Sequence, residues 1–427
     1  MNWLRLDGFD VGLPRQIHDE AGRLIEVQID CVPTSSELPV CCLAPRLVKN
    51  GTKTAKYRDL RIEAAPTWLH VSRQRWKCQG CGGTLYQPVP HMDEHHMMTE
   101  RLRETVELSS IKRTFRDTVA VHGVEEKLAR RIFRSRADRQ LLNYRFDAPR
   151  VLGIDENHLL GAARGVIVDV ESGKLLDIYE GRTQSDIRRG FDRMDRWENV
   201  EVWCQDMAGP YKGIARDLFP NAAIVIDKFH VLTKANHWFT KIRVAETPKL
   251  SRDVRERLPG LIRIFDMHWE QLSPRQQVRL AEVLAHSKRL SDAWAIKEAF
   301  YYWYDAPTRA DAERAYTEWV QFVRSKDQMT EWQPLMKMVQ RWRKEIFNYF
   351  DHRYTSGVVE RMNRSIADIN RAGNGMDFQT LRAKALLRHG RLIEEWHFKL
   401  AAIFQMVAAL ALLAICAASA DQPFISV

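Results

Sequence analysis

The chain has few cysteines, fewer acids than bases, and no apolar stretch at its start. Its first residues, MNWLRLDGFDVG, carry charges where a secretory signal is apolar, which argues against export. Seven cysteines, an odd number, argue against a disulfide-rich secreted scaffold, so we expect a reducing, cytoplasmic setting. The chain has 55 Asp and Glu residues against 65 Lys and Arg residues, and the resulting net charge of +10 favours a polyanionic partner.

The clearest metal-binding pattern lies near the start of the chain, where five of the seven cysteines fall within 81 residues. In RWKCQGCGG, Cys78 and Cys81 form a CxxC knuckle, and the glycines after it let the backbone turn around a metal. One such pair supplies half of a tetrahedral zinc site. The sequence therefore predicts a zinc module that needs two further ligands.

The second half of this zinc site has several candidates. Cys41 and Cys42 are the natural partners, but because they are adjacent we expect only one of them to bind comfortably. The other residues that could complete the set are Cys31, His91, His95 and His96. The alternative is a degenerate knuckle that folds without metal.

Between Met98 and Asn143 the pattern is helical and basic. TERLRETVELSSIK, TFRDTVAVHG and VEEKLARRIFRSRADRQLL predict three helices, with Gly123 at the turn between the second and the third. This is the layout of a helix-turn-helix, whose last helix enters the major groove of DNA. The arginines on that helix that suit phosphates and guanine edges are Arg130, Arg131, Arg134, Arg136 and Arg139. The alternative is a solvated basic face on an ordinary helical linker.

Residues 149 to 230 alternate strands and helices, and three of the predicted strands end in an aspartate. RVLGIDEN leads to Asp155, VEVWCQD to Asp206 and AAIVID to Asp227. Three strands in a meander, a helix and two further strands are the order of a ribonuclease H-like sheet. Ligands of open α/β sheets bind beyond the carboxyl ends of the strands, so these acids predict a site there.

A helical and tryptophan-rich stretch from 232 to 348 then predicts an insertion with an aromatic core. After it, FNYFDHRYTSGVVERMNRSI predicts a helix that begins near Val358, with Glu360 in its first turn and Asn363 one turn on. An acid there can simply be a favourable charge at the helix dipole. Taken with Asp155 and Asp206, however, Glu360 completes three carboxylates, enough to hold two magnesium ions for phosphodiester chemistry.

Four of these segments resemble the DDE transposases of bacterial insertion sequences: GIDEN, WCQDMAGPY, VIDKFHV and FNYFDHRYTSGVVERMNRSI. The chain is similar to the ISL3 type from about Cys41 to about His389. That type has a zinc finger and a helix-turn-helix ahead of its catalytic domain. The resemblance implies an α/β fold with a ribonuclease H-like core, interrupted by a large helical insertion.

The resemblance also implies roles for single residues. It assigns two Mg²⁺ (or Mn²⁺) ions and the catalysis to Asp155, Asp206 and Glu360. It also implies a zinc-binding module, for which the candidate ligands here are Cys41, Cys42, Cys78 and Cys81, although the first pair is adjacent where the family has CxxC. We expect supporting roles for Asp227, His230 and Asn363. For Asp227 and His230 the alternative is a strand-end acid and a hydrogen-bonded histidine at the start of a helix.

We expect seven segments along the chain. They are N-terminal strands (1–38), a zinc-finger-like module (39–92), a helix-turn-helix (96–146), the first part of the core (149–235), a helical insertion (236–345), the second part of the core with the catalytic Glu (346–396) and an apolar tail (397–427). Residues 400–420 of the tail carry no charge and are long enough to span a membrane. A buried or oligomer-forming helix, or a poorly ordered extension, is the interpretation that we favour.

The predicted function is that of a DNA transposase. It would bind the terminal inverted repeats of its own element, nick the element's ends and join the freed 3′-hydroxyl to target DNA, as at least a dimer. One alternative is a catalytically inactive or domesticated DNA-binding regulator, which has no need for acids at all three positions. The other is a ribonuclease H-like, structure-selective nuclease, which needs no recognition of particular DNA ends.

Overall fold

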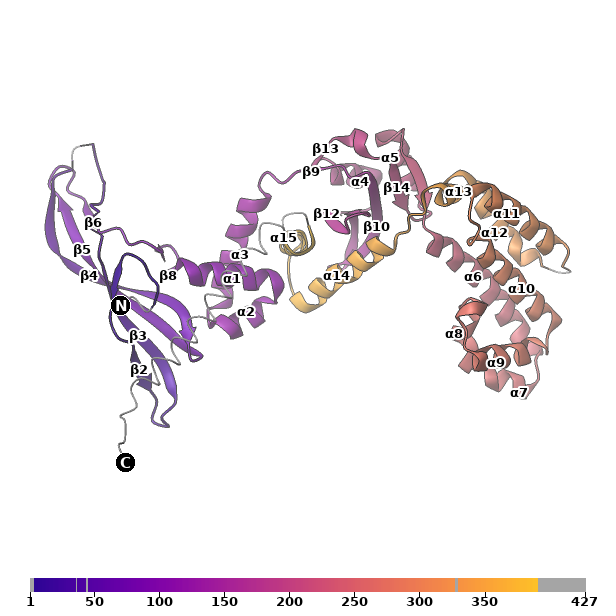
Figure 1. The fold of residues 1–427 in the computed structure, drawn as a ribbon, viewed down its shortest axis with the longest axis horizontal. Helices are drawn as coiled ribbons and strands as arrows, with labels where there is room; N and C mark the ends of the chain where they lie inside the picture. The colour runs from indigo at the N-terminus through magenta and orange to yellow at the C-terminus, as the bar shows by residue number, and fades with distance from the viewer. Residues whose placement is uncertain (1–3, 36, 44, 327–328, 391–427) are drawn as a thin grey trace, which may run out of the picture. The chain divides into compact units, whose positions relative to one another are not determined.

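The computed structural model describes residues 4–35, 37–43, 45–326 and 329–390. The predicted apolar tail, 397–427, lies outside these residues. The chain divides into two compact units, and Figure 1 shows their elements. Unit 1 comprises Met1–Asn143 with Arg371–Val427, and unit 2 comprises Tyr144–Asn370. Among the described helices, none has both the length and the apolar character needed to cross a membrane.

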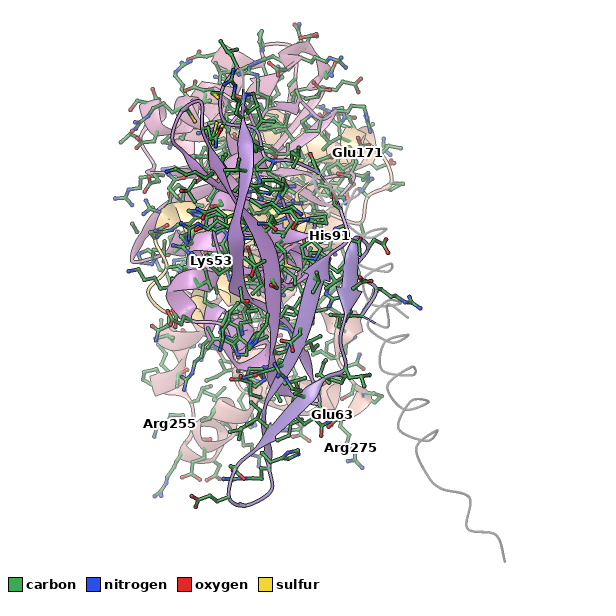
Figure 2. The ribbon with its side chains drawn as sticks, turned by 90° about the vertical axis from the view of Figure 1, so that its left-hand side faces the viewer. Lys53, Glu63, His91, Glu171, Arg255 and Arg275 are labelled. Atoms are coloured by element: carbon green, nitrogen blue, oxygen red, sulfur yellow. The ribbon has the colours of Figure 1, made fainter. Side chains whose placement is uncertain are left out.

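Unit 1 begins with an eight-stranded sheet, toward which Figure 2 looks, with Lys53 labelled on one of its long strands. Its strands are β1 (Phe9–Val11), β2 (Arg15–His18), β3 (Leu24–Pro33), β4 (Leu47–Ile62), β5 (Ala65–Cys78), β6 (Thr84–Tyr86), β7 (Met92–Asp93) and β8 (Met98–Thr99). The main order is β1-β3-β5-β4-β8-β7, with β2 on β3 and β6 on β5. Residues 1–38 and 39–92, which we treated as separate segments, share this sheet because β3 pairs in parallel with β5.

Three helices follow the sheet, as the periodicity predicts: α1 (Glu100–Lys112), α2 (Phe115–His122) and α3 (Glu126–Leu141). Gly123 ends α2 with φ +65°, a conformation that favours glycine. The Arg61 side chain of β4 lies over this turn, where a Cβ on Gly123 would be 2.2 Å from its Nη2, and Nη1 donates to the carbonyl of Ala120. The sheet therefore holds the turn between α2 and α3 in place.

A fourth helix, α15 (Phe378–His389), belongs to this helical part of unit 1. Its Ala383 and Leu387 join the apolar core of α1 to α3. The ammonium of Lys384 donates to the backbone carbonyl of Arg113 and lies over the Phe115 ring. This differs from the expectation that 346–396 forms one part of the catalytic core, because the apolar face of α15 packs on α1 and α3.

Unit 2 is built around a five-stranded sheet of order β12-β11-β10-β14-β15. Its strands are β10 (Val151–Leu159), β11 (Ala162–Asp169), β12 (Lys174–Glu180), β14 (Val202–Gln205) and β15 (Ala223–Ile226). The first three strands form an antiparallel meander, and β14 and β15 then add in parallel beside β10. The remaining elements of this part are β9 (Phe146–Asp147), α4 (Gln184–Gly190), β13 (Met194–Asp195) and α5 (Gly209–Leu218).

The rest of unit 2 is helical, as predicted. Its helices are α6 (Lys228–Glu246), α7 (Arg252–Arg257), α8 (Ile262–Phe265), α9 (Pro274–Leu284), α10 (Lys288–Trp303), α11 (Arg309–Arg324), α12 (Gln333–Arg341) and α13 (Arg343–His352). Of the tryptophans predicted to fill its core, five are buried and two, Trp238 and Trp269, are partly buried against it; the buried ones are Trp294, Trp303, Trp319, Trp332 and Trp342. Helix α14 (Gly357–Gly373) then returns to the sheet beside β10 (Figure 1).

Candidate active site

The parallel strands of unit 2 bring three aspartates to the same level of the sheet. Gly153 of β10 pairs with Cys204 of β14, so Asp155 and Asp206, each two residues further on, stand side by side. Gln205 of β14 pairs with Ile226 of β15, which places Asp227 level with Asp206. One detail differs from the sequence prediction. Asp155 lies within β10 rather than at its end, because the strand continues to Leu159 by pairing with β11.

Asp155 is surrounded by the other charged groups of the site. Burial raises its pKa to about 6, against the effect of the Glu156 backbone N–H, which donates to Oδ1. The nearby carboxylates of Asp206 and Glu360 raise this pKa further, whereas His230 lowers it. The acids from β10, β14 and α14 are therefore close enough to disfavour one another's charge.

Asp206 begins the loop that leads into α5. Burial raises the pKa of its carboxyl, and His230, the backbone N–H of Ala208 and Lys234 each oppose that rise. Its Oδ1 is buried without a hydrogen-bond partner among the described residues. The amide of Gln205 fixes the loop by donating to the carbonyls of Asp206 and Ala208. Because a buried carboxylate oxygen without a partner is costly, a cation bound at this position would stabilise it.

Helix α14 packs directly on β10 and carries Glu360 in its first turn. The contact is close, because a Cβ on Gly153 would lie 2.6 Å from Cγ2 of Val359. One turn beyond Glu360, the Nδ2 of Asn363 donates to Oδ2 of Asp155 at 2.9 Å. The predicted supporting residue Asn363 thus contacts a predicted catalytic acid directly.

Asp227 and His230 lie next to Glu360, a proximity that the sequence did not indicate. One ligand atom from each of the three residues lies within 4.8 Å of the other two, a spacing that can hold a metal ion. Asp227 is buried, and its Oδ1 accepts the Ser356 backbone N–H at 3.0 Å, directly before α14. Its Oδ2 is buried and has no partner among the described residues. Asp227 therefore connects the end of β15 to the helix that carries Glu360.

The donor set of this site fits magnesium. Asp155, Asp206, Asp227 and Glu360 offer oxygen ligands, which Mg²⁺ prefers, and a few carboxylates suffice because the ion keeps several waters. Buried carboxylate oxygens without hydrogen-bond partners are costly unless a cation or a proton satisfies them. The partnerless oxygens of Asp206 and Asp227 are the observation that supports a cation here.

A residue that we did not single out also lines this site. Tyr211, in the first turns of α5, is buried. Burial raises the pKa of its hydroxyl to about 12, and the nearby Tyr179 hydroxyl opposes this rise. The carboxylates of Glu156, Asp206 and Asp155 add to it. Tyr211 is the last residue of the WCQDMAGPY segment, so its motif position was the available signal.

The four cysteines of the predicted zinc module come together at one end of the unit 1 sheet. The Sγ–Sγ distances are 3.8 Å for Cys41–Cys42, 3.9 Å for Cys42–Cys78 and 3.5 Å for Cys41–Cys81. Four thiolates around tetrahedral zinc, with Zn–S near 2.3 Å, are about 3.8 Å apart. Backbone N–H groups of Cys81 and Arg46 lower the pKa of Cys78 to about 6, which favours the thiolate that binds metal.

This geometry corrects the expectation that only one of the adjacent cysteines can bind. Cys41 and Cys42 both point into the cluster, because a bend at residues 42–43 brings their sulfurs together with those of the CxxC knuckle. Cys31 instead lies buried in the apolar core of the sheet. The cluster found among the described residues does not include His91, His95 or His96. The four cysteines therefore support a structural zinc ion.

Replacing Cys81 with serine is expected to reduce bound zinc from about one ion per chain to about zero. The thermal midpoint of unit 1 should fall by at least about 5 °C, since metal binding contributes to folding. Metal analysis and thermal melting of the full chain measure both effects. The matched control is Cys31→Ala, which should retain zinc. Loss of zinc in Cys31→Ala but not in Cys81→Ser would contradict the assigned ligands.

The five arginines predicted to bind DNA do not share one face of α3, because a helix turns by about 100° per residue. Arg136 and Arg139 point back toward α1, where both pair with the buried Glu107 at 3.8 and 3.0 Å. Arg103 of α1 completes this cluster at 2.6 Å from Glu107. These two arginines hold α3 against α1.

The remaining three arginines lie on another side of α3. Arg130 pairs with Glu126 one turn away, and Arg134 pairs with Asp377 at 2.9 Å. Arg131 is exposed, and the described residues place no acid within ion-pair distance of it. Ion pairs as exposed as Arg134–Asp377 contribute little to stability and can exchange for a phosphate.

Comparisons with known proteins show which family the chain resembles. A family model described as a transposase, of the DDE and ISL3 type, matches residues 152–385. A second, described as the zinc-finger of transposase IS204/IS1001/IS1096/IS1165, matches residues 40–81. The chain is 22% identical to the transposase for insertion sequence element IS1001 of Bordetella parapertussis, over 377 residues that cover 84% of this chain and 89% of that protein. It is 23% identical to the transposase for insertion sequence element IS1557 of Mycobacterium tuberculosis (strain CDC 1551 / Oshkosh), over 401 residues that cover 86% and 90%.

Proposed function

The chain belongs to the ISL3-type family of transposases, and from that premise we propose that it cleaves and joins DNA by two-metal chemistry at the acids of unit 2. The observation that carries the proposal is that Asp155 and Asp206 lie side by side on neighbouring strands, and that the helix carrying Glu360 is hydrogen-bonded to Asp155. The sheet order, three antiparallel strands followed by two parallel ones, supports a ribonuclease H-like core. The alternative, a non-catalytic regulator, does not explain why carboxylate oxygens of this site are buried without hydrogen-bond partners among the described residues.

The acids of the chain would hold two Mg²⁺ or Mn²⁺ ions, with Asp155, Asp206 and Glu360 as the proposed ligands. When bound, such ions stabilise charge on the phosphate and lower the pKa of the attacking water or 3′-hydroxyl. The protein's own part is to fix the ligand oxygens before DNA arrives. Asn363 orients Asp155 through its 2.9 Å hydrogen bond, and Asp227 holds the start of the helix that carries Glu360.

We propose that unit 1 supplies recognition of the DNA ends. Helices α2 and α3, joined at Gly123, have the layout of a helix-turn-helix, with α3 as the helix that enters the major groove. Arg131, exposed and without an ion pair in the described part of the chain, is the arginine best placed to contact base edges. Because two element ends must be held together for transposition, we propose at least a homodimer in the active complex.

The test is cleavage of a DNA fragment that carries the gene's own flanking ends, with Mg²⁺ added. We expect cuts at the ends, no cuts in EDTA, and no cuts when the end sequences are scrambled. Specific binding without any cutting would favour the regulator. Cutting that ignores the end sequence would favour the structure-selective nuclease, and either result would overturn the proposal.

A further inference from the structure

Unit 1 contains a groove between its sheet and α3. The groove has a volume of about 740 Å³. Arg58 of β4 and Trp68 of β5 lie on the sheet side, and Lys127, Arg131 and Arg134 lie on the helix side. Arg58 and Trp68 are paired across the two strands, with the guanidinium 5.5 Å from the centre of the indole ring. A cation and an aromatic surface thus face the basic side of the predicted recognition helix.

The two sides of this groove are held at a fixed separation. Arg61, three residues beyond Arg58 on β4, donates to the carbonyls of Ala120 and Val121 at the end of α2. Arg58 also reaches the turn, where its Nη2 lies 2.9 Å from the position of a Cβ on Gly123. A strand that contacts this turn cannot separate from α3 without breaking those contacts. The groove is therefore part of the folded unit.

The charge of the groove differs from that of the opposite side of α3. Five cations line it, against the two acids Glu125 and Asp138. On the opposite side, the acids Asp93, Glu104 and Glu107 balance the charges of Arg103, Arg136 and Arg139. Burial lowers the pKa of Arg58, the charge of Arg61 lowers it further, and Glu125 opposes this shift. The Nε of Arg58 is buried and has no hydrogen-bond partner among the described residues. Among the described residues, the groove side of α3 therefore carries an excess of cations, which can attract a polyanion.

We propose that this groove holds the sugar-phosphate backbone of the duplex whose major groove α3 enters. The proposal rests on the proposed function, because it takes DNA as the partner of α3. In this arrangement the Arg58 guanidinium contacts a phosphate and the Trp68 indole packs against a deoxyribose. The sheet that carries the zinc cluster thereby contributes directly to DNA binding, although the sequence pointed only to the helices.

The experiment measures DNA binding by the full-length protein as a function of salt. Arg58→Gln should weaken binding to terminal-repeat and random duplexes alike, by roughly fivefold to tenfold at 0.15 M salt, and reduce the salt slope by about one. The ratio of the two affinities should stay the same, because a phosphate contact carries no sequence information. Trp68→Ala should weaken both duplexes without changing the slope. Arg58→Lys, which keeps the charge, should restore the slope.

The matched control is Lys53→Gln. Lys53 lies on the same strand, outside the groove residues and over the Tyr86 ring, and Figure 2 labels it. This variant loses the same charge and should bind like the wild type. Unchanged affinity and slope for both Arg58→Gln and Trp68→Ala would overturn the groove proposal. If the wild type shows no preference for the element's ends, the proposed function fails instead.

Discussion

Replacing Asp206 with alanine is expected to abolish Mg²⁺-dependent cleavage at the element's ends, a loss of at least about 100-fold. The reason is that Asp206 contributes a buried oxygen with no hydrogen-bond partner in the described residues, at the level of Asp155 in the neighbouring strand. Without this carboxylate the site would lose one of its proposed oxygen ligands. Binding to the ends should persist, because the helices that we propose to bind DNA belong to unit 1. Cleavage and gel-shift assays on the same DNA measure both quantities.

The matched control for this variant is Asp217→Ala. Asp217 lies at the end of α5, exposed and paired with Arg188, so its removal should leave cleavage unchanged. Asp206→Cys provides a further readout, because a thiolate accepts Mn²⁺ more readily than Mg²⁺ and should restore some cleavage in manganese. Asp155→Asn and Glu360→Gln should be inactive in the same way. A variant that cleaves at the wild-type rate would show that its residue is not a ligand.

Much of unit 2 could be predicted from its sequence, because local patterns determine its strands. Apolar runs that end in Asp155, Asp206 and Asp227 require buried strands, and parallel neighbours bring their ends to one edge of the sheet. The continuation of β10 beyond Asp155 could not be predicted in this way. It depends on the pairing of residues 156–159 with β11, which the polar sequence ENHL does not indicate.

Contacts between distant segments account for most of what the sequence did not reveal. The periodicity of α3 predicts a helix and its arginines, but only the position of Glu107 on α1 shows that Arg136 and Arg139 face inward. In the same way, the apolar residues of α15 do not identify α1 and α3 as the helices against which it packs. The proximity of Asp227 to Ser356, 129 residues away, also follows from the fold alone.

That last contact leads to the second large effect, which is expected for Asp227→Ala. The substitution leaves the Ser356 backbone N–H buried without its acceptor, which should cost about 1–3 kcal/mol of folding free energy. Because this bond fixes the chain directly before α14, Glu360 should lose its position and cleavage should fall by at least about tenfold. Thermal melting and end cleavage by the full-length protein measure the two losses.

Asp227→Asn separates a positioning role from metal binding at this residue. The asparagine side chain keeps an oxygen that can accept the Ser356 N–H but lacks the charge that a metal ligand needs. If Asp227 acts only by holding the start of α14, this variant should recover the wild-type melting temperature and most of the cleavage. If it is instead fully folded yet as inactive as Asp206→Ala, then Asp227 is itself a ligand. The 4.8 Å cluster of Asp227, His230 and Glu360 would in that case be part of the metal centre, and the supporting role would be wrong.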